Sequence, residues 1–508
     1  MTRILVLVAL VAAGCSGGGS DRPSVGERAG TTTTAAPRDG GVLRVGIETP
    51  RSLDPATARS ASDAIAADLL YDGLTAVDGK GEVVPALADR WQAAPDQTKW
   101  DFHVRTGATF SNGQPVTPAA IVASLERVRS TGSDLLKSGL GVVRSISAPA
   151  PDLVHLELTE PFADLPALLS NAGYGVVAPG WTADAPVGSG PFRFDRRDGD
   201  VLHLVKTASA GGPHVDGVDL HLGDVAASFD AFKAGKLDVS LVPPSASDEA
   251  AEKAGRANFV PYVAEVFYGF NLKSPKFADG RFREAIVHAV DRTAIGDVVY
   301  GGAVEPIDGP VPRGLPAFQE KPCNVRCTHD VARAKALLAE AFPPGSGASP
   351  PAIAIDYDAD STQEAVAKAI QANLSAVGIT ATLRPHPVAD YAQVVGKGEQ
   401  ELFRLGWVGL YPAADAFLTP LFRSGSDTNV TGFAVPAVDD VLRAARAEPD
   451  PAARLEKYRD AERRIMDLVP IVPIAQFETL AVASRRVRGL AFNPLGSFDG
   501  SSVWLAGS

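Results

Sequence analysis

The chain has 508 residues, of which 45% are hydrophobic and 21% are charged, so it is long enough for two or more lobes with their own cores. Its formal net charge is −12, and no block of basic residues interrupts the sequence. Binding to nucleic acid is therefore disfavoured, because phosphate backbones attract basic surfaces.

The first fifteen residues predict export and attachment to a membrane. A short basic start, Met1–Arg3, precedes an apolar run, Ile4–Ala13, that is too short to span a bilayer. Small residues then lead into Cys15, which resembles a bacterial lipoprotein signal over residues 1–14, although Ala12 stands where such signals usually have Leu. Cleavage before Cys15 leaves a lipidated cysteine, and a diacylated cysteine is a two-chain anchor. The predicted location is the extracytoplasmic face of the cytoplasmic membrane. A plain secretory signal with an incidental cysteine is the alternative.

Residues 15–40 are rich in Gly, Ser, Thr, Pro and charge, a composition that cannot bury a core. We expect a disordered tether here, with the folded part of the chain beginning at Gly41.

Two further cysteines, Cys323 and Cys327, are separated by three residues. An exported protein can oxidise such a pair to a disulfide, and closing so small a loop stabilises the fold by roughly 2 kcal/mol. A metal site is disfavoured, because two thiols and the neighbouring His329 are an incomplete ligand set.

The elements that follow the tether alternate between strand and helix patterns. Residues 41–47 and Trp100–Arg105 alternate with period two and predict strands, and residues 64–71 predict a helix. Thr117 followed by Pro118 predicts a capped helix start.

Five short motifs in this region occur in a fixed order within about sixty residues. They are Leu53-Asp-Pro55, Leu70-Tyr-Asp-Gly-Leu74, Pro85-Ala-Leu-Ala-Asp-Arg-Trp91, the Trp100–Arg105 strand and Phe110-Ser-Asn-Gly113. Together they resemble the N-terminal lobe of the family-5 extracellular solute-binding proteins, the dipeptide, oligopeptide and nickel receptors of ABC importers. The resemblance continues through the mature chain, for example at Val187–Phe192 and Phe267–Leu272.

This resemblance implies an α/β fold of the periplasmic-binding-protein type, with two lobes joined by a hinge and an extra subdomain in lobe 1. The expected limits are 41–265 for lobe 1, with the subdomain at about 59–185, then 266–478 for lobe 2 and 479–508 for a return to lobe 1. Strands and helices alternate in lobe 2. The apolar segment Leu468–Ile474 contains prolines and therefore predicts an edge strand or an extended crossing.

The ligand site is predicted in the stretch Leu402–Leu418. Family resemblance implies backbone contacts from Gly406 and Trp407. In peptide receptors of the family an Asp three residues past this Trp binds the peptide's α-ammonium, but here that position is Leu410. A buried ammonium needs a carboxylate partner, which a leucine cannot provide. Three options stay open: a peptide bound with its ammonium solvated, a ligand without an ammonium such as a sugar, a blocked peptide or a metal chelate, or loss of transport.

Tyr411 beside Leu410 suggests an apolar wall at the same site. Weaker candidates for ligand contact are Asn271, Tyr71 and Asn429, for which packing or a turn role is the more typical function. Asp415 is expected to cap the helix that begins at Ala416.

The predicted function is a monomeric, lipid-anchored substrate-binding protein that delivers a small solute, a peptide or a related molecule, to a permease pair and its ATPase. It predicts a sizeable cavity between the lobes. The alternative is an envelope lipoprotein outside transport, an adaptor or regulator, which predicts a filled cleft. An enzyme is disfavoured because the sequence has no convincing catalytic triad, metal motif or phosphate loop. No cofactor is expected.

Overall fold

The computed structural model describes residues 36–207 and 212–507. The predicted signal segment 1–14, Cys15 and most of the tether therefore lie outside the described residues. The last residues of the predicted tether are attached to the fold. The Gly40 N–H donates to the His214 carbonyl at 2.8 Å, and the Asp39 carboxylate pairs with the His214 ring at 2.9 Å. The compact unit accordingly begins at Pro37 rather than Gly41. Among the described residues no helix has the length and apolar character needed to span a bilayer.

Lobe 1 is built on a sheet in which the first strand, β1, is central. β1 runs parallel to β10 and β11, and β9 and β8 extend the sheet in antiparallel fashion. The alternating residues Leu43, Val45 and Ile47 of β1 are buried in a core shared with helix α1. The elements of this lobe are β1 (Val42–Glu48), α1 (Ala61–Leu70), β8 (Phe192–Asp198), β9 (Val201–Lys206), β10 (Gly217–Gly223), α5 (Val225–Lys233), β11 (Val239–Leu241) and α6 (Ser247–Ala254).

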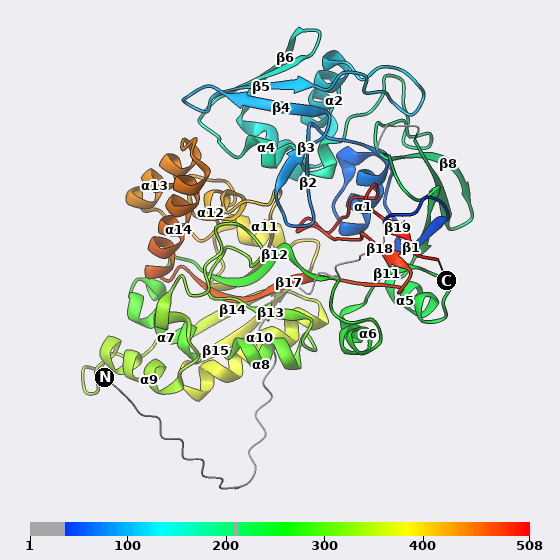
Figure 1. Cartoon of the computed structure of the whole chain (residues 1–508). Coiled ribbons are helices and arrows are strands. Elements are labelled where there is room, and N and C mark those ends of the chain that lie inside the picture. The colour runs from blue at the N-terminus through cyan, green and yellow to red at the C-terminus, as the bar shows by residue number, and fades with distance from the viewer. Residues whose placement is uncertain (1–35, 208–211, 508) are drawn as a thin grey trace, which may run out of the picture. The chain divides into compact units, whose positions relative to one another are not determined.

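The inserted subdomain contains a four-stranded antiparallel sheet in the order β4-β5-β7-β6, with α2 packed on it (Figure 1). Helix α2 begins as the sequence predicts, since the Thr117 hydroxyl accepts from the Ala120 N–H and Pro118 is the first helical residue. The elements are β2 (Thr75–Val77), β3 (Val83–Pro85), β4 (Ala88–Ala93), β5 (Lys99–Val104), α2 (Pro118–Thr131), α3 (Asp134–Gly139), β6 (Val143–Ala150), β7 (Leu153–Leu158) and α4 (Leu165–Leu168).

Lobe 2 contains the parallel strands β14, β15 and β16 with helices beside them, as the alternating pattern predicts. A disulfide joins Cys323 to Cys327, with 5.9 Å between the Cα atoms. The elements are α7 (Gly280–Ala289), α8 (Arg292–Val298), β13 (Val304–Pro306), α9 (Val331–Ala341), β14 (Ile353–Asp358), α10 (Ser361–Ala376), β15 (Ala381–His386), α11 (Tyr391–Lys397), β16 (Leu402–Val408), α12 (Asp415–Phe422), α13 (Pro436–Arg446) and α14 (Pro451–Asp467). The short strands β18 (Val487–Arg488) and β19 (Trp504–Leu505) follow in the tail, whose Val487 and Val503 lie in the lobe 1 core.

Two long strands, β12 (Phe259–Phe270) and β17 (Ile471–Ala483), join the lobes (Figure 1). β17 pairs with β12 along most of its length and then with β11 of lobe 1. The predicted lobe limits at residues 265 and 478 fall inside these strands. The register of the pair shifts twice in β12, between Pro261 and Glu265 and between Val266 and Phe267. Such irregular sections weaken a ladder locally, which is what a hinge requires.

The segment Leu468–Ile474 was predicted to form an edge strand or an extended crossing, and it does: among the described strands the first residues of β17 pair with β12 alone, and β17 then crosses to lobe 1. Further along, β17 becomes an interior strand, where β13 pairs with Ala475–Phe477 and β11 with Ala481–Ala483 on the side away from β12. Proline is usually excluded from interior positions of a sheet, because it has no N–H to donate. Here Pro473 lies opposite Phe267, next to a register shift, so the ladder is already interrupted where the donor is missing.

The inserted subdomain also packs against lobe 2. The ring centroids of Phe162 and Tyr411 lie 5.7 Å apart, edge to face. The Asp164 carboxylate pairs with Arg454 at 3.1 Å and accepts from the Tyr458 hydroxyl at 2.9 Å. One continuous apolar core includes both parts, whereas the lobe 1 sheet has a separate core.

Candidate functional site

A small cavity lies where lobe 1, the subdomain and lobe 2 meet. Its volume is about 60 Å³. Ligand pockets typically measure about 300–1,000 Å³, so this space holds water molecules rather than a peptide. This cavity is smaller than the sizeable one expected from the sequence, so a ligand of peptide size requires the lobes to separate here. Residues of six segments that are distant in sequence line the cavity, among them Arg59, Ser60, Asp68, Leu136, Asn171, Tyr262, Val263, Val408, Gly409, Leu410 and Leu495.

The hinge strand contributes directly to the cavity. Tyr262 and Val263 line it, and both lie in the irregular section of β12 between Pro261 and Glu265. The Gly409 N–H donates to the Val263 carbonyl at 2.7 Å, which fixes the end of β16 against this section. A Cβ on Gly409 would lie 2.5 Å from the Phe417 ring, so this turn requires glycine.

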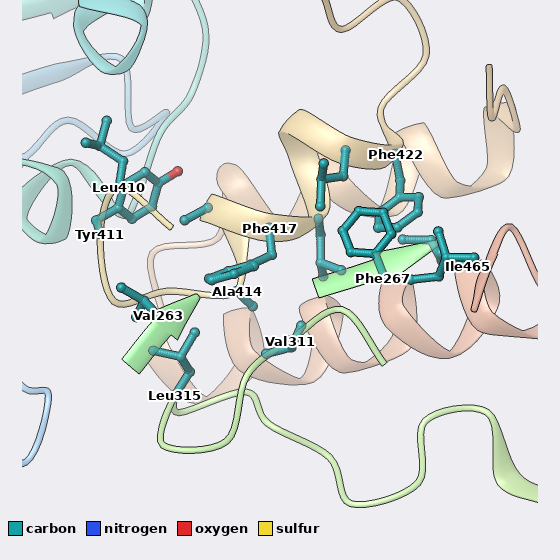
Figure 2. Packing of buried hydrophobic residues seen from close by; sticks show 14 of the residues in the cluster. Val263, Phe267, Val311, Leu315, Leu410, Tyr411, Ala414, Phe417, Phe422 and Ile465 are labelled. Atoms are coloured by element: carbon teal, nitrogen blue, oxygen red, sulfur yellow. The ribbon is translucent and has the colours of Figure 1, made fainter. Parts of the chain in front are cut away.

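Leu410 lines the cavity and is 93% buried against the subdomain. Its carbonyl oxygen accepts a hydrogen bond from the Asn171 side-chain amide at 2.8 Å. Its side chain lies so close to Gly139 that a Cβ there would come within 2.4 Å of Leu410 Cδ2. Figure 2 shows Leu410 and Tyr411 near other buried apolar side chains, among them Val263 and Phe417. The setting of position 410 is thus apolar.

Three other predicted residues of the same stretch do not line the cavity. The Trp407 indole N–H donates to the Ala416 carbonyl at 2.8 Å, so it is used within lobe 2. Gly406 is exposed, beside the Arg404 guanidinium. The Tyr411 hydroxyl is buried and donates to the Asp415 carboxylate at 2.7 Å. Of the stretch Gly406–Tyr411, the residues that reach the cavity are Val408, Gly409 and Leu410.

The weaker candidates have structural partners. The Asn271 amide donates to the Gly398 and Gln400 carbonyls at 3.0 and 2.7 Å, and the Asn429 amide donates to the Arg423 and Phe433 carbonyls at 3.0 and 2.7 Å. The Tyr71 hydroxyl donates to the Leu53 carbonyl at 2.8 Å. These contacts hold loops in place, and none of the three residues lines the cavity.

The prediction that Asp415 caps a helix was wrong. Ala414 occupies the cap position, and the Asp415 carboxylate is fully buried. It accepts from the Tyr411 and Thr419 hydroxyls and forms an ion pair with Arg446. The cause is tertiary. Arg446 lies at the end of α13, too far along the chain for a local sequence pattern to pair it with Asp415. Arg446 also bonds Glu160 of the subdomain at 3.1 Å, and its guanidinium carbon lies 4.4 Å from the Phe162 ring centroid.

Sequence reasoning missed two charged residues that line the cavity, Arg59 and Asp68. Ser60, Ala64 and Asp68 follow one another at intervals of four, so they form a stripe on a single face of α1, and all three line the cavity. Burial raises the pKa of Asp68 to about 7; the Ser497 hydroxyl opposes this shift, and the charges of Asp72 and Asp499 add to it. The spacing was a readable signal, but a charged helical residue usually belongs to a solvated face.

Residues 82–429 match the model of the bacterial extracellular solute-binding proteins, family 5. The probable D,D-dipeptide-binding periplasmic protein DdpA of Escherichia coli is 26% identical over 91% of this chain and 93% of its own length. The probable di/tripeptide-binding protein 5 of Pseudomonas aeruginosa is 26% identical over 86% of this chain and 90% of its own.

Among solved structures, the periplasmic murein tripeptide binding protein MppA in its unliganded open form has a TM-score of 0.81 at 23% identity, covering 92% of this chain and 98% of its own. The two-lobed α/β fold is thus shared with this structure. The family match covers well over half of the chain, in the region that holds the subdomain, the hinge strand β12 and β16. The chain therefore belongs to the bacterial extracellular solute-binding proteins of family 5.

Proposed function

We propose that this protein is the peptide-binding receptor of an ABC importer, anchored through a lipid on Cys15 at the outer face of the cytoplasmic membrane. The observation that carries the proposal is the position of the cavity. It lies beside the irregular section of the strand that joins the lobes, and both lobes line it. The relatives named for dipeptides, tripeptides and murein tripeptides support a peptide as the ligand.

The proposed mechanism is binding coupled to lobe movement. Rotation about β12 and β17 separates α1 of lobe 1 from the end of β16 and enlarges the space between them. A ligand that contacts both sides then favours the closed arrangement, because closure adds contacts that the open form lacks. The closed receptor docks on a permease pair, and the associated ATPase drives transport. Binding and release require no catalytic group in the receptor, and the described residues hold no cluster of three or more potential metal ligands.

The test is a ligand search with the intact mature protein. Native mass spectrometry identifies any molecule that co-purifies with it. Thermal shift then compares di- to pentapeptides, N-acetylated peptides and sugars. Stabilisation by peptides alone supports the proposal, and stabilisation by sugars alone reassigns the ligand. If nothing binds, the envelope adaptor replaces the transport receptor as the better explanation.

Membrane attachment needs a separate test. Cys15→Ser removes the only atom that the proposed lipid could modify. We expect the wild-type protein to enter the detergent phase in Triton X-114 partitioning, and the variant to stay in the aqueous phase. Equal partitioning of both proteins would contradict lipidation at this residue.

A further inference from the structure

The cavity contains a carboxylate that faces Leu410 from the opposite lobe. Asp68 belongs to α1 of lobe 1 and lines the same space of about 60 Å³ as Leu410 of lobe 2. Ser60, the N-cap of α1, and Ala64, one turn before Asp68, also line the cavity, and both have small side chains.

Asp68 has no cationic partner. Among the described residues no cation acts on the pKa of its carboxylate; the Ser497 hydroxyl, which donates to the Ala64 carbonyl at 3.4 Å, is the polar group that lowers it. The nearest charges are also negative. Asp72 is paired with Arg105 at 3.1 Å, and Asp499 lies in the C-terminal segment beside α1. A partly buried carboxylate with two acidic neighbours and no cation is unfavourable by itself, and an external cation relieves it.

Other charged groups at the cavity do not satisfy Asp68. Arg59 lines the cavity too, but its side chain is exposed. Its charge lowers the pKa of Asp134 and does not contribute to the pKa of Asp68. From lobe 2 the cavity receives Val408, Gly409 and Leu410, which carry no charge. The Asp68 carboxylate therefore requires one positive charge from a ligand, on the lobe 1 side of the cavity.

We propose that Asp68 binds the protonated amino group of the ligand, in place of a carboxylate at position 410, and that the ligand is a short peptide with a free N-terminus. Leu410 then packs against the peptide's apolar atoms rather than against its charge. This inference rests on the proposed function and names the group that selects the substrate. In this proposal the counter-charge comes from lobe 1 and not from position 410 of lobe 2. The ammonium is therefore bound on lobe 1 before the lobes close.

The experiment compares Asp68→Asn with the wild type by calorimetry and thermal shift. The probes are trialanine and N-acetyl-trialanine, supplemented by a pooled library of di- and tripeptides with free or acetylated N-termini. Glu252→Gln is the matched control, since Glu252 is an exposed carboxylate on α6. Removing the partner of a desolvated charge should weaken binding of free-amine peptides on the order of a hundredfold. The control should bind as the wild type does.

The outcomes separate the inference from the proposed function. Loss of free-amine binding in Asp68→Asn, with weak binding of acetylated peptides throughout, supports the inference. If the wild type binds free and acetylated peptides equally, or Asp68→Asn keeps full affinity, the inference is wrong while the peptide receptor stands. If the wild type binds no peptide, both fall. If circular dichroism shows that Asp68→Asn misfolds, Asp68→Glu replaces it, because this variant keeps the charge on a longer side chain. A retained preference for free amines then supports the inference, and loss of that preference overturns it.

Discussion

The side-chain amide of Asn171 donates a hydrogen bond to the carbonyl oxygen of Leu410, across 2.8 Å and 239 positions of sequence. This bond attaches the inserted subdomain to lobe 2 at a residue that lines the cavity. The inserted subdomain thus contacts both the backbone and the side chain of Leu410.

Asn171→Asp tests this attachment. The new carboxylate can still accept from the Gly173 N–H, as Asn171 Oδ1 does at 2.8 Å, but it cannot donate to Leu410. We expect a loss of about 1–3 kcal/mol in the free energy of unfolding, because the buried carbonyl loses its donor. Urea denaturation followed by tryptophan fluorescence measures the loss. An unchanged midpoint would show that water replaces the donor.

The ion pair between Arg446 and Asp415 should be essential for stability. Arg446→Ala leaves the fully buried Asp415 carboxylate without its cation, so we expect a loss of about 3–5 kcal/mol. In the double variant with Asp415→Asn much of this loss should be recovered, because no buried charge is left unpaired. Arg443→Ala is the control. Arg443 lies on the same helix in an exposed pair with Asp440, and its removal should change stability by at most about 0.5 kcal/mol.

Stability should fall as the pH rises from about 5 to 8. Burial raises the pKa of Glu462 to about 8, while hydrogen bonds from Gln319 and the Val311 N–H partly oppose the shift. Burial also raises the pKa of Glu265, and the charge of Glu462 adds to it. The folded state keeps protons that the unfolded state releases, so the free energy of unfolding decreases with pH, by up to about 1.4 kcal/mol per pH unit for each group.

The contribution of Glu462 is complete below a pH of about 4.5, where both states are protonated, and is lost as the pH passes about 8. Glu462→Gln removes this titration, so the difference in unfolding free energy between wild type and variant should shrink steadily from pH 5 to 8. Urea midpoints at half-unit pH intervals provide the measurement. A difference that does not vary with pH would mean that Glu462 is ionised in the folded protein.

Peptide binding should weaken below neutral pH. The pKa of Asp68 is raised to about 7, mainly by burial, and only its ionised form attracts an ammonium. Affinity for a free-amine peptide should therefore fall by up to about tenfold per pH unit below 7. Asp72, whose pKa burial raises to about 6, titrates in the same range, while Asp499 near Asp68 and Arg59 at the cavity are further charged groups of the site. The Asp68→Asn variant isolates the contribution of Asp68, because its residual pH dependence belongs to the other groups.

Proton release provides an independent measurement of the same prediction. A cation bound at Asp68 lowers its pKa, so binding at pH 6 should release close to one proton, and the heat of binding should vary with the ionisation enthalpy of the buffer. Identical heats in phosphate and imidazole buffers would contradict a titrating carboxylate at the ligand.

Local patterns predicted most elements of this fold because they depend on nearby residues. Thr117 and Pro118 start α2, and the alternating apolar residues of β1 face a core, since capping and strand burial act over a few positions. Ordered motifs predicted the family, and through it the two lobes. What the sequence could not provide is the partner of each group across the fold. Asp415 meets Arg446 rather than capping a helix, and β17 continues past its edge section into the interior of the sheet, where β13 and β11 pair with it. Asp68 reaches the cavity because α1 and β16 converge there. These outcomes depend on which distant segments pack together, and only the tertiary structure decides that.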